Sequence, residues 1–270
     1  MIVRNSFRRQ ASNILPSCQR TMLLSAVESG IYSKGCSEYD HNLCDSMQSL
    51  AIFVGTINHA HSQCGEIVLD PLDLMEEYHS IEYELLTLPH SIQSHAAALK
   101  SHDYPSPSSI GSDRPSGDVQ DIAQNAKTHI QMALRIAGLF YLRLVKGGPT
   151  ESLHGSVHML RTLLQHLDRI ADLPTLVSSH AIHGYSRSAL IWICLVADLI
   201  LWASINEGWK FHEHKWGSYV CHDFLVWALG GDDVEMVTDH DLALCRILDL
   251  GNFRSGTRDP RTYIQRILAM

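Results

Sequence analysis

The chain has 270 residues, and 45% of them are hydrophobic, which is enough to bury a sizeable core in one large domain. The formal net charge is −8, yet residues 1–27 hold four arginines and no acidic residue, so the rest of the chain is strongly acidic. An acidic body repels nucleic acid, which restricts any direct DNA contact to the short basic N-terminus or to a partner chain.

The N-terminal segment contains no continuous apolar run, so it does not predict a secretory signal. Its arginines, its serines and its lack of acid resemble a mitochondrial presequence, and the alternatives are a disordered basic tail or a truncated gene start. We expect residues 1–40 to form a basic, disordered extension and residues 41–270 to form one helical domain.

The seven cysteines are odd in number, irregularly spaced and without a C-x2-C pair. This pattern favours free thiols in a reducing compartment over disulfides. Most of the cysteines are therefore expected to be small packing residues in the interior.

The first part of the helical domain contains two predicted helices and a loop. Residues 43–60 favour a helix over a strand, and residues 71–89 form a helix bracketed by prolines at both ends. Residues 100–117 are rich in Pro, Ser, Gly and Asp without periodicity, which predicts a linker or a long surface loop.

The central part of the chain predicts a pair of antiparallel helices. Residues 118–146 carry one apolar stripe at spacings of three and four, with Asp118 as the expected N-cap and a stop at residues 147–149, Gly-Gly-Pro. Residues 153–167 repeat the leucine-rich pattern up to Pro174. The link between the two helices is short, so they should pack as neighbours.

Residues 189–205 are apolar throughout except for Asp198 in the middle. A membrane span needs about 20 apolar residues and a charge at its centre is costly, so the pattern favours a buried core helix over a span. Ser186 or Ser188 is expected to cap this helix, and Asp198 should need a partner or a route to solvent. Its large side chains should cover the whole circumference: Trp192, Ile193, Leu195, Val196, Leu199, Ile200 and Trp202.

The C-terminal part predicts shorter helices over residues 216–229, 239–249 and 260–268, broken by Gly230-Gly231 and Gly251. No alternating strand pattern appears anywhere in the chain. The expected fold class is therefore all-α, a multi-helix bundle or irregular helical array around the helix at 189–205.

Catalytic motifs are absent or incomplete. The sequence has neither GxxxxGK[ST] nor GxGxxG, and "HEHKW" places Trp216 where a zinc-protease motif needs its second histidine. "GYSRS" ends in Ser188 where a nucleophile elbow needs glycine, so its serines are interpreted as helix-start residues. We expect a protein that is not an enzyme, with no catalytic residues and no cofactor.

Two histidine groups offer an alternative function as a helical metal-binding protein or metalloenzyme. His154 and His158 are four residues apart and would share a helix face, and "HAHSQC" (59–64) with Cys44 supplies two histidines and two cysteines. Neither group has the spacing of a recognised metal motif, so we expect no metal ligands.

Residues 134–167 resemble the central helical pair of the fungus-specific transcription factor regulatory region, the region that follows a binuclear zinc cluster. The matching features are the segment from Ala137 to Leu144 and the break at residues 147–149. The segment 189–208 is similar to the family's Trp-containing buried helix, and Lys215-Trp216 stands in the basic-Trp segment after it. The resemblance covers roughly residues 70–270.

The chain departs from that family in its DNA-reading module, which needs six cysteines beginning C-x2-C-x6-C. Here the closest early cysteines, Cys36 and Cys44, are eight residues apart. The resemblance therefore implies a nuclear regulator of transcription reduced to its regulatory half, which reaches DNA only indirectly. It implies protein partners, either a second copy of this chain or a DNA-binding transcription factor, and no membrane.

Overall fold

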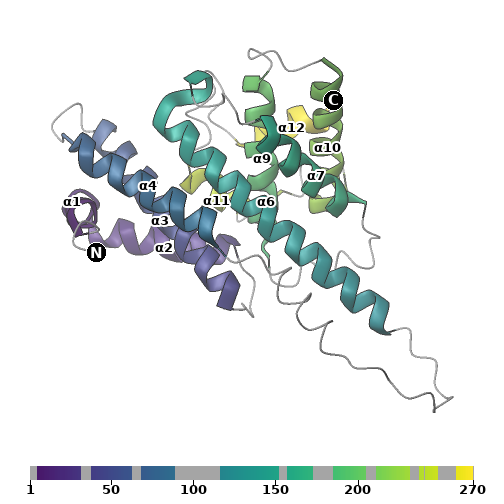
Figure 1. Ribbon diagram of the computed structural model, residues 1–270, viewed down its shortest axis with the longest axis horizontal. Coiled ribbons are helices and arrows are strands. Elements are labelled where there is room, and N and C mark those ends of the chain that lie inside the picture. The colour runs from purple at the N-terminus through teal and green to yellow at the C-terminus, as the bar shows by residue number, and fades with distance from the viewer. Residues whose placement is uncertain are drawn as a thin grey trace.

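The computed structural model describes residues 5–31, 38–62, 68–88, 116–151, 157–172, 185–204, 211–231, 237–239, 241–248 and 260–269. Within these residues every regular element is an α-helix, which confirms the predicted all-α class (Figure 1). The helices are α1 (Asn5–Ile14), α2 (Ser17–Ile31), α3 (Glu38–Ser62), α4 (Pro71–Thr87), α6 (Ser116–Glu151), α7 (Val157–Ala171), α9 (Arg187–Ser204), α10 (Phe211–Leu229), α11 (Ala243–Ile247) and α12 (Pro260–Leu268).

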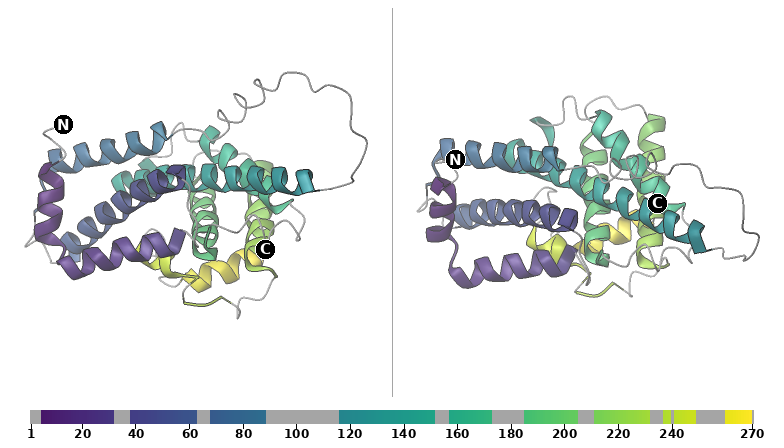
Figure 2. Two further views of the ribbon diagram at one scale, coloured as in Figure 1. Left: turned by 90° about the horizontal axis from the view of Figure 1, so that it is seen from below. Right: turned by 60° about the horizontal axis from the view of Figure 1, so that its bottom comes forward.

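The long helix α6 joins two groups of helices into one array. On one side α6 contacts α3 and α4, which pack with α1 and α2 (Figures 1 and 2). On the other side it contacts α7 and α9, which pack with α10. The predicted α6–α7 neighbours are therefore in contact, and one continuous hydrophobic core runs through both groups.

Helix α9 is the buried centre of the second group. All of its residues except Arg187 and Trp202 are buried, because α6, α7, α10, α11 and α12 pack around it. By length and composition alone α9 could cross a membrane, but 89% of its apolar window is buried inside this fold. The core assignment is thus confirmed, with one correction: Trp202 is 37% exposed, so the apolar surface does not close around the last turn.

The N-terminal prediction was wrong for residues 5–31, which form α1 and α2 instead of a disordered extension. The apolar side chains of this segment follow no clear helical stripe, but several of them are buried: Phe7 and Ala11 in α1, and Val27 and Ile31 in α2. Phe7 packs against Phe53 of α3 with ring centroids 5.5 Å apart. Long-range contacts of this kind override a weak local pattern, because most helix stability comes from tertiary packing.

The predicted boundaries of α6 were also wrong. The helix begins at Ser116, so Asp118 lies inside it rather than at the N-cap, and it continues through the Gly-Gly-Pro sequence to Glu151. Proline removes one backbone hydrogen bond and bends a helix without always ending it. Accordingly, the C-terminal turns of α6 curve away from the main axis in Figure 1. Residues 100–115 of the predicted linker lie outside the described residues.

The other predicted helices are present in the structure, but two differ in extent: α10 begins at Phe211 instead of residue 216, and the helix predicted over 239–249 is only the short α11. Several helix ends have visible causes. Pro71 occupies the first turn of α4, and the Asp70 carboxylate accepts a hydrogen bond from Leu72 N at 2.8 Å. Ser186 caps α9 by accepting from Ala189 N at 3.2 Å. After α10 the chain turns at Gly230, whose φ of 77° suits glycine.

Candidate functional site

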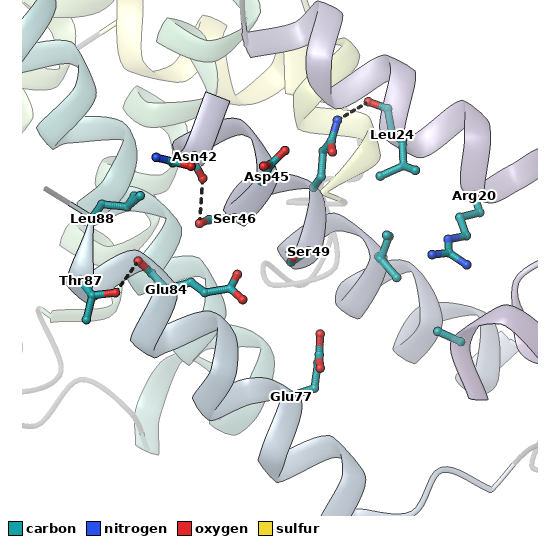
Figure 3. Close-up of a pocket in the computed structure, with 13 residues that line it drawn as sticks. Arg20, Leu24, Asn42, Asp45, Ser46, Ser49, Glu77, Glu84, Thr87 and Leu88 are labelled. Atoms are coloured by element: carbon teal, nitrogen blue, oxygen red, sulfur yellow. Dashed lines mark hydrogen bonds between the residues drawn. The ribbon is translucent and has the colours of Figure 1, made fainter. Parts of the chain in front are cut away.

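A pocket of about 590 Å³ lies in the N-terminal group between α2, α3 and α4, and Ala11 of α1 also lines it (Figure 3). Most of the residues that line it are of polar types, and they include three carboxylates, from Asp45, Glu77 and Glu84. Arg20 of α2 lies on the opposite side of the pocket from α4. The size of this pocket is within the range of small-molecule sites.

The α3 wall of the pocket follows from the helical period. Four pocket residues on α3 recur at spacings of three, four and three, namely Asn42, Asp45, Ser49 and Ile52, and Ser46 and Gln48 line the pocket beside them. A second set on the same helix, which includes Leu43, Met47 and Leu50, is fully buried in the core. One face of α3 therefore holds the fold together while the neighbouring face lines the pocket.

Helix α4 likewise has one face in the pocket and an adjacent face in the core. Glu77 and Glu84 are seven residues apart, two helical turns, and both side chains point into the pocket in Figure 3. Tyr78, Ile81 and Leu85 on the adjacent face are buried in the core. Glu77 is itself only 6% exposed, so its carboxylate is held in a largely dry part of the pocket.

Several polar groups of the lining are oriented by hydrogen bonds. The Arg20 guanidinium donates to Ser12 Oγ at 2.8 Å, and the Gln48 amide donates to Leu24 O at 3.4 Å. The hydroxyls of Ser46 and Thr87 donate to carbonyls of their own helices. The carboxylates outnumber the guanidinium in this lining, so the pocket favours a small polar ligand that carries a positive charge.

A second polar arrangement lies between α6 and α7, where His129 and His166 face each other. Their Nδ1 atoms are 2.8 Å apart, and their ring centroids are 5.0 Å apart. Burial, followed by the charges of His129 and Arg169, lowers the pKa of His166 to about 4. Burial, followed by Arg169, also lowers the pKa of His129. The pair is therefore neutral at pH 7.

The buried carboxylate of Asp198 faces the C-terminal helix. Arg266 Nη2 of α12 lies 3.9 Å from Asp198 Oδ2, with the arginine half exposed and the aspartate 5% exposed. His214 of α10 is also near: burial lowers its pKa, and the charge of Asp198 partly offsets that effect. Asp198 thus has the partner that the sequence required of it.

The predicted metal groups do not assemble in the described residues, which contain no cluster of three or more His, Cys, Asp or Glu side chains fit to hold a metal. His158 is exposed on α7, and His154 lies outside the described residues. On α3, Cys44 is buried, His61 is exposed and His59 borders a different, shallower pocket.

The cysteines that the structure describes are free, and all except Cys18 are buried. Cys194 donates to the carbonyl oxygen of Cys221 at 3.2 Å. The hydrogen bond from Cys194, and then burial, raise the pKa of Cys221, and burial raises the pKa of Cys245. Thiols held protonated in this way are packing residues rather than nucleophiles.

The comparisons returned nothing. No family model matches this chain, and neither the curated proteins nor the solved structures contain a match to it. The function of the chain has to be argued from its own residues.

Sequence reasoning missed the pocket and every residue in it. The sequence contained only a weak signal for the pocket: Glu77 and Glu84 are seven residues apart, so they share one helix face beside the apolar stripe. Arg20 was assigned to a disordered segment, so it was not considered as a wall of a site. The packing of both α2 and α4 against α3 brings these residues together.

Proposed function

We propose that this chain is the regulatory domain of a nuclear transcription regulator, which binds a small cationic effector in the pocket between α2, α3 and α4. The observation that carries the proposal is a ligand-sized, carboxylate-lined pocket in an all-helical body whose described residues present no metal cluster. The resemblance of residues 134–167 to the fungal regulatory region supports the transcriptional role.

The segments that carry the resemblance occupy the interior of the fold, as their pattern requires. Ala137, Phe140, Tyr141, Leu142 and Leu144 are all buried on α6, and α9 is buried along nearly its whole length. Tyr141 meets Trp192 edge to face, with ring centroids 5.8 Å apart. These contacts join the two resembling segments into one core, which supports treating them as parts of a single domain.

Contact with DNA is proposed to run through a partner protein. The chain outside residues 1–27 is strongly acidic, and an acidic surface weakens phosphate contacts. A regulatory domain of this charge would act on a promoter by docking on a DNA-binding transcription factor.

A tethering assay in nuclei tests the transcriptional role. The full chain is fused to a heterologous DNA-binding module, and a reporter gene carries that module's sites. We expect reporter output to change several-fold relative to the module alone, and the untethered tagged chain to be recovered in the nuclear fraction and enriched at discrete promoters by chromatin pull-down. An inert fusion together with a cytosolic, unenriched chain would contradict the proposal.

Paired substitutions separate the effector site from the scaffold. The double variant Asp45→Asn with Glu84→Gln removes two pocket charges, and Glu28→Gln removes an exposed charge of α2 outside the pocket. We expect the double variant to abolish effector-dependent changes in reporter output and Glu28→Gln to preserve them. Equal responses in both variants would remove the pocket from the proposed function.

A further inference from the structure

Helix α4 has a third face, which points away from both the core and the pocket. It presents four large apolar side chains to solvent: Leu72 (74% exposed), Met75 (38%), Tyr83 (66%) and Leu86 (51%). With His79 they occupy positions 72, 75, 79, 83 and 86, so the spacings are three, four, four and three. We call these five residues the outer stripe of α4.

This spacing is that of a helix seam, in which side chains three and four residues apart form one continuous strip. Isolated exposed apolar residues are ordinary, but several of them on one face of a helix over successive turns mark an interaction surface. The core side chains of α4 are a separate set that includes Tyr78, Ile81 and Leu85. The outer stripe is therefore additional to what the fold needs.

The position of α4 leaves room for a partner. In Figure 2 α4 runs along the outer edge of the array, beside α1 and α3 and with no described helix over its other side. The stripe spans four turns of helix, which matches the footprint of a single amphipathic helix in helix-in-groove recognition.

The charges beside the outer stripe identify the kind of partner. Helix α4 carries five acidic residues and no lysine or arginine. Glu76, which is exposed, lies on one flank of the stripe, and Glu82 lies on the other, where it pairs with Arg143 at 3.6 Å and with His79 at 3.4 Å. Rim charges such as these select the partner and steer its approach.

We propose that the outer stripe of α4 docks an amphipathic helix of another protein, one whose apolar face is flanked by lysine or arginine. A second copy of this chain is disfavoured as the occupant, because pairing α4 with itself would bring two acidic rims together without a basic residue on either helix. The assignment does not depend on the transcriptional role, since it rests on α4 alone.

The test is a binding titration of the full chain with labelled synthetic helices, followed by fluorescence anisotropy. The first probe is an 18-residue peptide with leucine at seam positions and lysine on both flanks. The second has glutamate in place of every lysine, and the third is a scrambled lysine peptide. We expect the lysine helix to bind at least ten-fold more tightly than either of the other two.

Variants place the binding on the stripe. Tyr83→Ser with Leu86→Ser alters two exposed stripe residues, and Met22→Ser with Tyr219→Ser alters two exposed apolar residues elsewhere, which makes a matched control. We expect a ten-fold or greater loss of lysine-helix binding in the first pair and no loss in the second. Glu76→Lys should weaken the lysine helix and strengthen the glutamate helix.

Three results would overturn the proposal. Equal affinity for the lysine helix and the scrambled peptide would show that the chain does not recognise the seam pattern. Equal losses in both variant pairs would place the binding elsewhere. Self-association of the wild-type chain in sedimentation velocity, abolished by the stripe variant, would assign the surface to a second copy instead. All of these binding measurements use the purified chain. The docking proposal can therefore fail while the reporter assay succeeds, and the reporter assay can fail while the docking proposal holds.

Discussion

His129 and His166 stand with their Nδ1 atoms 2.8 Å apart across the α6–α7 contact, a separation that accommodates one shared hydrogen and no second one. One ring must donate and the other accept, so protonating both is unfavourable. This pair is the clearest source of pH-dependent stability in the described residues.

The first prediction concerns that dependence. The pKa of His166 lies at about 4 in the folded chain and near the ordinary 6.5 when unfolded, so its contribution is fully present above pH 6.5 and is lost as the pH falls toward 4. Because His166 is partly exposed, solvent screening reduces the loss below what the pKa difference alone would give, to roughly 1–2 kcal/mol. Urea unfolding at pH 7 and at pH 4.5 measures it. His166→Leu should show a smaller drop, and His158→Leu, at an exposed position on the same helix, should behave like wild type.

The second prediction concerns the pair formed by Asp198 and Arg266. Arg266→Ala leaves a buried carboxylate with less compensation and should cost about 1–2 kcal/mol. Asp198→Leu removes the charge itself and should stay within about 1 kcal/mol of wild type. As a control, Arg246→Ala breaks a pair with the exposed Asp239 and should leave the stability close to that of wild type. Denaturant midpoints in the reverse order would show that Asp198 does not rely on Arg266.

The third prediction compares two tryptophans of α9. Trp192 is fully buried against Tyr141, so Trp192→Ala should cost about 3–5 kcal/mol through lost burial and a cavity. Trp202 is 37% exposed, and Trp202→Ala should cost less than about 1 kcal/mol. Melting temperatures measure both. An unchanged melting temperature in Trp192→Ala would contradict the place of α9 at the centre of the core.

The fourth prediction concerns two helical glycines. A Cβ at Gly217 of α10 would lie 2.9 Å from a Leu201 methyl carbon and 3.0 Å from one of Leu164, so Gly217→Ala should destabilise by about 1 kcal/mol or more. At Gly30 of α2 the nearest atom would be 3.5 Å away, which is ordinary contact. Gly30→Ala should therefore stabilise the chain by up to about 1 kcal/mol, the usual gain over glycine in a helix. Calorimetric unfolding of the two variants should shift in opposite directions.

The sequence by itself determined the helical class, the buried α9, the start of α4 and the C-terminal end of α10. In each case the information is local: a 3.6-residue apolar period, a proline or aspartate at the first turn, or a glycine pair at the last. Asp198 was recognisable as a residue in need of a partner because a charge in an apolar helix is costly wherever that helix lies.

Tertiary structure alone decided that residues 5–31 form helices, and it alone created the pocket and the histidine pair. Phe7 stabilises α1 only because Phe53 stands opposite, 46 residues away in the chain, and no period in the sequence encodes that contact. Asp45 and Glu84 line the same pocket, and His129 contacts His166, through the packing of separate helices. Local patterns fix which face of a helix is apolar, whereas the packing of helices against one another fixes which polar side chains are brought together.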